Sequence, residues 1–126
     1  RILELANRMI DAFRIDTPTP QTHSKFLSGG NIQKIILARE IDACRGLLVA
    51  AYPSRGLDVS ATEYVRNQII EQSESGKAVL LISEDLEELM TVADQIAVLY
   101  EGRIMGILTC KEADTEKLGM MMAGIE

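Results

Sequence analysis

The 126-residue sequence lacks several features on which whole classes of function depend. It contains no Trp, only 4% of its residues are aromatic, and His23 is the only histidine, so a core must be built from aliphatic side chains and Met. No run approaches the roughly 18 apolar residues that a membrane-spanning helix needs, and no secretory leader opens the sequence. We therefore expect a soluble protein that reaches a membrane only through a partner.

Positive charge is also scarce. The net charge is −6, with eight basic and five acidic residues in 1–55 against five and fourteen in 56–126. Nucleic-acid binding depends on clustered Lys and Arg, so no nucleic-acid partner is expected. Cys44 and Cys110 stand far apart without the spacing of metal ligands, which predicts two buried free thiols in a reducing compartment.

The first half of the sequence predicts two helices joined by an extended connector. Apolar residues recur at three- and four-residue intervals over 1–14, which is typical of a helix with one apolar face, and its abrupt start suggests a piece of a longer protein. Two prolines interrupt the connector, residues 16–25. A second helix should follow Gly29 and Gly30, with these side chains pointing inward: Ile32, Ile35, Ile36 and Ala38.

The second half alternates strands and helices, which predicts an α/β fold with mostly parallel strands. Residues 47–52 and 78–82 are short apolar runs typical of strands buried on both faces. A capping box of Ser60 and Glu63 should begin the helix between them, and Gly76 should end it. A further helix is expected at 85–92 with Ser83 as its cap, then a β-hairpin over 95–109 and a short closing helix over 111–126.

The octet Leu27–Lys34 (LSGGNIQK) is the most informative stretch. Serine and two glycines at a helix start bring free N–H groups and a hydroxyl close to an anion, and the helix dipole favours negative charge. A plain glycine-containing turn is the alternative on these residues alone. The octet resembles the signature motif of ATP-binding-cassette (ABC) domains, in the spelling found in monosaccharide and nucleoside importers.

Other segments extend this resemblance in the same order along the chain. Leu47–Tyr52 lies where the family has its Walker B strand, Arg55–Asp58 resembles the D-loop, and 93–104 resembles the hairpin that closes the domain core. The resemblance implies a partial P-loop NTPase (ABC ATPase) core with flanking helices and a C-terminal β-hairpin and helix. Residues 1–126 would form one partial nucleotide-binding domain, with 1–25 ending the helical subdomain and 26–126 carrying the signature helix and the C-terminal half of the core.

The resemblance also assigns roles to individual residues. The signature loop would close over the γ-phosphate of ATP held by another nucleotide-binding domain, and Asp58 would lie at the interface between the two domains. The residues implied in nucleotide binding in trans are Ser28, Gly29, Gly30 and Asn31.

Three departures from the family pattern concern hydrolysis. The Walker B carboxylates, which hold Mg²⁺ and polarise water, are replaced by Ala51 and Tyr52, and the switch histidine is replaced by Glu84. An alanine binds no metal, and a phenol is a poor base at neutral pH. No G-x-x-x-x-G-K-[ST] motif occurs. We therefore expect no catalytic residue and no tight ATP binding in this segment alone.

Acidic residues around position 85 offer no convincing metal site. Glu84, Asp85, Glu87 and Glu88 are better explained as first-turn acids that the helix dipole favours. His23 is best explained as a loop residue, and the Met cluster near the C-terminus as adaptable packing.

These observations predict part of the degenerate second nucleotide-binding domain of a sugar or nucleoside importer. Its partners would be another such domain and transmembrane permease subunits, with ATP and Mg²⁺ in the assembled complex on the cytoplasmic face of the membrane. The alternatives are a soluble ABC ATPase that is not a transporter, which would be expected to keep its Walker B carboxylates, and a non-catalytic assembly domain. A strand at 47–52 without its neighbours also predicts self-association.

Overall fold

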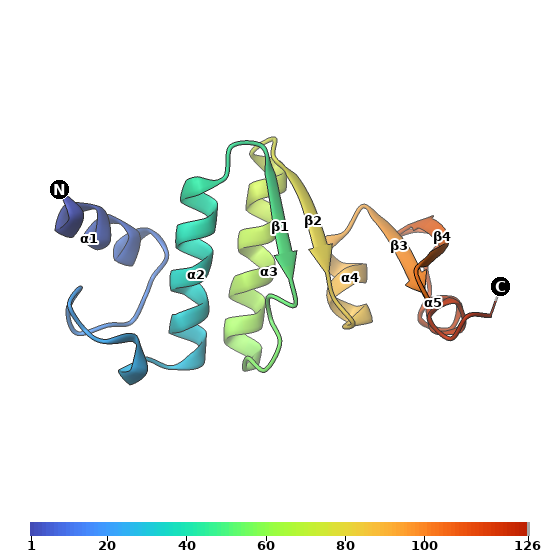
Figure 1. Ribbon diagram of the computed structural model, residues 1–126, viewed down its shortest axis with the longest axis horizontal. Coiled ribbons are helices and arrows are strands. Elements are labelled where there is room, and N and C mark those ends of the chain that lie inside the picture. Colours follow the sequence, from blue (N-terminus) through green and yellow to red (C-terminus); the bar gives the residue numbers. More distant parts are fainter. Residues whose placement is uncertain (126) are drawn as a thin grey trace. The chain divides into compact units, whose positions relative to one another are not determined.

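The computed structural model describes residues 1–125 and divides into two compact units. The first unit comprises Arg1–Leu80, and the second begins at Leu81. Figure 1 shows the order of helices and strands along the chain. The α/β class predicted from the sequence is confirmed, and the two units are described separately.

The first unit contains three helices beside a two-stranded sheet. Its elements are α1 (Ile2–Ala12), the 3₁₀ turn η1 (Ser24–Phe26), α2 (Gly29–Ala43), β1 (Leu47–Ala51), α3 (Val59–Glu74) and β2 (Ala78–Ile82), the last two residues of which belong to the second unit. Helix α2 packs against α1 and α3. Strands β1 and β2 are neighbours in one sheet and run in the same direction (Figure 1), as expected for parallel strands.

The inward face predicted for α2 is wrong in part. Ile32, Ile35 and Ile36 remain 36–40% exposed, whereas Leu37 and Ala38 are 5% and 1% exposed. The three isoleucines follow helical spacing, but spacing alone does not say which neighbours cover a face. Within the described residues, α2 packs against α1 and α3, and its buried residues are Leu37 and Ala38.

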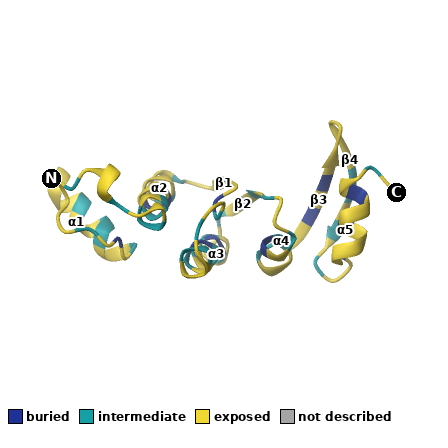
Figure 2. Cartoon of the chain, turned by 90° about the horizontal axis from the view of Figure 1, so that it is seen from below, coloured by how far each residue is buried: buried dark blue, intermediate teal, exposed yellow. Residues whose placement is uncertain are grey.

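Burial of β1 on both faces is also wrong. Leu48 and Ala50 are buried, whereas Leu47 and Val49 are 58% and 55% exposed. Successive side chains of a strand point to opposite faces, so Leu48 and Ala50 share the buried face of β1 and Leu47 and Val49 share the exposed one. Figure 2 shows α3 on one side of the sheet. The continuous apolar run is therefore half exposed in this structure.

Aspartates cap two helices for which the sequence analysis had chosen serines. The Asp58 carboxylate accepts a hydrogen bond from the Ala61 amide at 2.7 Å, so Asp58 and not Ser60 is the N-cap of α3. Likewise Asp85 caps the next helix, while Ser83 only accepts from the Asp85 amide. Each aspartate reaches the free amide three residues on. The predicted stop at Gly76 is confirmed by its φ of +91°.

The second unit is a hairpin covered by a helix. It contains α4 (Leu86–Val92), β3 (Gln95–Tyr100), β4 (Arg103–Thr109) and α5 (Thr115–Met122). The predicted hairpin is confirmed, and Glu101 and Gly102 both have positive φ, as a two-residue turn of this kind requires. Its core consists of Ile96, Val98, Ala113, Leu118 and Met121. The closing helix is shorter than 111–126, and Glu126 lies outside the described residues.

Candidate functional site

Ser28 occupies the N-cap of α2, the helix that carries the signature loop. Its backbone is extended (φ −64°, ψ 157°), and its hydroxyl oxygen accepts a hydrogen bond from the Asn31 amide at 3.2 Å. The same oxygen accepts a second hydrogen bond from the Asn31 side-chain Nδ2 at 3.1 Å. A serine hydroxyl has two acceptor lone pairs and one donor hydrogen, so both acceptor positions of Ser28 are filled and the O–H group remains available as a donor.

Gly29 and Gly30 form the first turn of α2. Amides in a helix's first turn have no acceptor within the helix and carry the positive end of its dipole. A Cβ at Gly29 would meet nothing within 4 Å, whereas one at Gly30 would lie 3.2 Å from the Ala61 Cβ of α3. Gly30 therefore permits a close approach of α2 to α3.

The loop opens into a pocket of about 310 Å³, which we call the signature pocket. Residues from α2, from the start of α3 and from the end of α1 line it: Arg14, Ser28, Gly30, Asn31, Lys34, Asp58, Ser60, Ala61 and Tyr64. Two of these side chains are cationic and one is anionic. The structure thus brings together the predicted residues Ser28, Gly30, Asn31 and Asp58, in a pocket with an excess of positive charge and hydroxyl and amide donors.

One wall of the signature pocket is held by contacts between α2, α3 and the end of α1. Lys34 Nζ donates to the Arg14 carbonyl at 2.9 Å and lies 4.7 Å from the centre of the Tyr64 ring. The Tyr64 hydroxyl donates to the Phe13 carbonyl at 2.8 Å. Arg14 has a left-handed φ of 49°, which turns the chain out of α1.

Burial raises the pKa of the Tyr64 phenol. The negative charge of Glu71 raises it further, and the positive charge of Arg14 opposes both effects. Tyr64 is therefore held in its protonated, hydrogen-bond-donating form.

The segment after β1 is joined to α2 by a hydrogen bond between its main chain and a side chain of the helix. Gln33 Nε2 donates to the Pro53 carbonyl at 2.6 Å. Arg55 lies 5.5 Å from the centre of the Tyr52 ring, and two successive turns lead from Tyr52 to Leu57. Asp58 thereby reaches the signature pocket, with one carboxylate oxygen already used to cap α3.

The three positions predicted to be degenerate are Ala51, Tyr52 and Glu84. Ala51 ends β1, and Tyr52 follows it, 45% exposed and with a left-handed φ of 49°. Glu84 is exposed and lies in the second unit, one residue before the cap of α4. Glu88, treated in the sequence analysis as a first-turn acid, is fully buried, which the pattern of charges did not predict.

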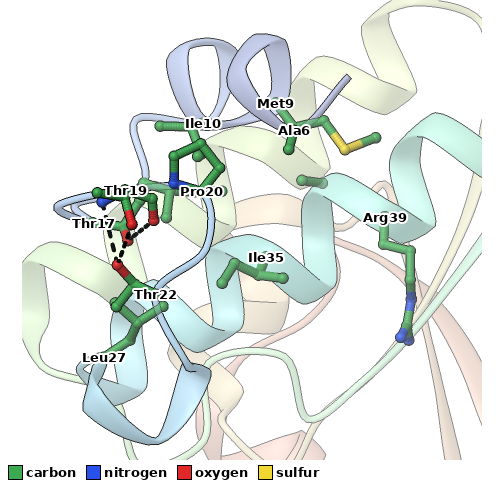
Figure 3. A pocket seen from close by; sticks show the side chains of 12 residues that line it. Ala6, Met9, Ile10, Thr17, Thr19, Pro20, Thr22, Leu27, Ile35 and Arg39 are labelled. Atoms are coloured by element: carbon green, nitrogen blue, oxygen red, sulfur yellow. Dashed lines mark hydrogen bonds between the residues drawn. The ribbon is translucent and has the colours of Figure 1, made fainter. Parts of the chain in front are cut away.

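A second hollow of about 210 Å³ lies between α1, the connector and α2 (Figure 3). Apolar side chains such as Met9, Ile10 and Ile35 line most of it. In the connector, the Thr17 hydroxyl donates to the Thr19 carbonyl and the Thr19 amide donates to the Thr22 hydroxyl, at 2.9 and 3.2 Å. Arg39 is the one charged residue among those that line it, and none of the predicted site residues lies there.

Three polar residues of the signature pocket were not predicted as site residues from the sequence. Arg14, Lys34 and Tyr64 come from the end of α1, from α2 and from α3. Lys34 belongs to the signature octet, so its position near the predicted site could be inferred from the sequence. No spacing rule links it to Arg14 or Tyr64, because those contacts join parts of the chain that are distant in sequence.

Known proteins similar in sequence are import ATP-binding proteins. The chain is 50% identical over 119 residues to the guanosine import ATP-binding protein NupO of Bacillus subtilis, a match that covers 94% of this chain and 23% of that protein. It is 41% identical over 119 residues to the nucleoside import ATP-binding protein NupA of Lactococcus lactis (94% and 24%). It is 35% identical over 124 residues to the ribose import ATP-binding protein RbsA of Bacillus subtilis (98% and 25%).

The chain therefore spans about a quarter of the length of these relatives. Among solved structures, an ATP-binding subunit of an ABC transporter matches 95% of the chain at a TM-score of 0.76 and 20% identity, covering 55% of that structure. The ATP-binding cassette MJ0796, dimeric with ADP and phosphate, matches 85% at a TM-score of 0.73 and 19% identity, covering 46% of that structure. No family model matches the sequence. Within residues 1–125, no helix is both long and apolar enough to cross a bilayer.

Proposed function

The chain belongs to the ATP-binding-cassette family as part of an ATP-binding protein, and from this we propose that its signature loop completes an ATP site held by another nucleotide-binding domain. The nucleotide would lie against Ser28, Gly29, Gly30 and Asn31, with Asp58 at the interface between the domains. ATP and Mg²⁺ would be bound in the assembled complex, chiefly by residues of the partner domain.

The observation that carries this proposal is the donor state of the signature loop. Ser28 has both acceptor positions filled and its hydroxyl hydrogen available, next to the Gly29 and Gly30 amides in the first turn of α2. Arg14 and Lys34 line the same pocket. These groups suit the terminal phosphate of ATP, which carries negative charge and accepts hydrogen bonds.

The degenerate positions support a role as donor of a loop and not as a hydrolytic site. The Ala51 side chain has no atom that could bind a metal. Tyr52 stands where the family has a carboxylate, and Glu84 stands where it has a histidine. Hydrolysis would therefore depend on the Walker motifs of the partner domain. We propose that residues 1–25 end the helical subdomain and that residues 26–126 carry the signature helix and the C-terminal half of the core.

The relatives suggest a place for the assembled protein. We propose an importer of simple sugars or nucleosides, with permease subunits as membrane partners and the ATP-binding protein on the cytoplasmic face. The exposed side of β1, which carries Leu47 and Val49, would be covered by the remainder of the domain. Without that cover the segment alone should self-associate. A clean monomer by size-exclusion chromatography with light scattering would contradict this.

The test is the ATPase activity of the full-length polypeptide with Ser28→Arg or Tyr52→Ala. Ser28→Arg places a bulky cation where the γ-phosphate would lie, and we expect it to abolish turnover. Tyr52→Ala should leave turnover unchanged, because this position has no hydrolytic group to lose. Turnover that survives Ser28→Arg would show that the loop is not used in hydrolysis and would favour an assembly role.

A further inference from the structure

We infer that Asn31 is a positioning residue that sets the Ser28 hydroxyl as a donor toward phosphate, a role that rests on the proposed function of the signature loop. The side chain of Asn31 is half-buried and makes two hydrogen bonds. One joins it to the connector and the other joins it to Ser28. In this arrangement the Asn31 amide is used within the protein, and it acts on the nucleotide through Ser28.

The orientation of the Asn31 amide follows from its partner in the connector. The backbone amide of Asp16 donates to Asn31 Oδ1 at 2.9 Å. A main-chain N–H group can only donate, so the atom that faces it must be the oxygen. Nδ2 is then the atom that faces Ser28 Oγ at 3.1 Å, and it can only donate. The direction of both hydrogen bonds is therefore determined by chemistry.

The Ser28 hydroxyl can therefore form one further hydrogen bond, and only as a donor. Its oxygen accepts from Asn31 twice, through the backbone amide and through Nδ2. The hydroxyl hydrogen cannot turn toward either group, because both are donors. It must find an acceptor elsewhere, and Ser28 is exposed at the mouth of the signature pocket. A phosphate oxygen is such an acceptor.

The connector that holds Asn31 is itself held in place. Arg14, two residues before Asp16, accepts a hydrogen bond from Lys34 through its carbonyl, and Phe13 accepts one from Tyr64. Ile15, which lies between Arg14 and Asp16 in the sequence, is buried, with 7% of its surface exposed. The Asp16 amide is thus part of an anchored turn, so the end of α1, the connector and the signature serine form one hydrogen-bonded series.

The substitution Asn31→Asp tests this series with little change of shape. The new carboxylate can still accept from the Asp16 amide, but its second oxygen becomes an acceptor in place of Nδ2. The Ser28 hydroxyl would then donate to the carboxylate and be lost to the nucleotide. One hydrogen bond to a charged group contributes roughly 10- to 100-fold, so we expect the ATPase rate of the full-length polypeptide to fall by about that factor at neutral pH.

The pH dependence separates this role from a general disturbance of the loop. A protonated carboxyl group has the hydrogen-bonding pattern of asparagine, with one oxygen accepting and an O–H donating. The activity of Asn31→Asp relative to wild type should therefore rise as the pH falls from about 8 toward about 4, the ordinary pKa of an aspartate carboxyl group, where about half of these groups are protonated. Arg14, Lys34 and Asp58 also line the pocket. Their own titration is common to both proteins and cancels in this ratio, whereas their charges shift the pH at which the new carboxyl group protonates.

Two further variants complete the experiment. In a Ser28→Ala background, Asn31→Asp should have at least tenfold less effect than in the Ser28 background, and the rise at low pH should disappear, because no hydroxyl remains to be oriented. The control is Asn67→Asp, the same change of charge at an exposed position of α3, which should leave activity and its pH profile unchanged.

The outcomes distinguish the two levels of the proposal. If Ser28→Ala leaves the ATPase rate unchanged, the proposed function of the loop is wrong. If Ser28→Ala lowers the rate but Asn31→Asp has the same effect in both backgrounds, Asn31 acts on the nucleotide directly and the positioning role is wrong. A pH-independent ratio, or a lowered melting temperature that accounts for the loss, would also overturn the positioning role.

Discussion

The close approach of α2 to α3 at Gly30 predicts that the two glycines of the signature loop respond differently to the same substitution. A Cβ at Gly30 would lie 3.2 Å from the Ala61 Cβ, whereas a Cβ at Gly29 would meet nothing within 4 Å. Both residues lie in the first turn of α2. Replacement by alanine should raise helix propensity by up to about 1 kcal/mol at either position.

The difference between Gly30→Ala and Gly29→Ala therefore measures the contact, because the gain in propensity is common to both. Relieving an overlap of a few tenths of an ångström should cost about 1 kcal/mol, the low end of the range for overpacking. This corresponds to roughly fivefold faster exchange of the α2 amides in Gly30→Ala than in Gly29→Ala, given that about 1.4 kcal/mol is tenfold.

Hydrogen–deuterium exchange with mass spectrometry on the full-length polypeptide gives this local opening free energy directly. The double variant Gly30→Ala with Ala61→Gly should recover the protection of α2, compared with Ala61→Gly alone, because the contact is removed from the other side. Equal protection of α2 in Gly29→Ala and Gly30→Ala would refute the reasoning, since it would show that α3 moves aside at no cost.

Three other predictions concern positions around the site and in the second unit. Tyr64→Phe should destabilise the end of α1 by about 1 kcal/mol, because the Phe13 carbonyl loses its hydrogen-bond donor while the aromatic ring near Lys34 remains. Faster amide exchange at residues 10–16 would show this loss, and Tyr100→Phe is the control. The pKa of Glu112 is lowered by hydrogen bonds from the Thr109 amide and hydroxyl, so its contribution to stability is present above the ordinary pKa of 4.5 and is lost as the pH falls through the lower folded value. NMR titration should place the Glu112 pKa below 4.5, and Thr109→Val should raise it; an unchanged value in the variant would contradict the assignment. Gly124→Ala should destabilise the protein more than Gly76→Ala. Both glycines have positive φ, which costs about 1–2 kcal/mol for alanine, but only at Gly124 would the new Cβ also lie 2.5 Å from the Tyr100 ring. Equal losses of protection from amide exchange in the two variants would show that the Tyr100 ring moves aside at no cost.

The order and bounds of the strands could be predicted from the sequence because their signals are local. The hairpin at 95–109 has a Glu101-Gly102 turn between two apolar runs, and the structure has the predicted strand bounds, with a register shift between Val98 and Leu99. The helix caps were wrong by two residues because Asp58 and Ser60 are both good capping residues. Only the backbone path after Gly56, where φ is +74°, determines which of them reaches the free amide.

Burial and the walls of the signature pocket could not be predicted in the same way. Whether Ile35 and Val49 are covered depends on which elements lie beside them, and periodicity carries no information about that. The link between Tyr64 and Phe13 joins residues 51 positions apart, and that between Lys34 and Arg14 joins residues 20 apart. The loop residues Ser28, Gly30 and Asn31 could be predicted because they belong to one continuous motif.

The contact between the connector and Asn31 has a consequence for how this segment tolerates mutation. The donor at position 16 belongs to the main chain, so the aspartate side chain is not needed for it. Almost any residue could replace Asp16 without breaking the contact, and only proline, which has no N–H group, would abolish it. Variation at this position among related sequences should therefore be wide, with proline excluded, and a search for invariant side chains would overlook a link that selection acts on through the backbone.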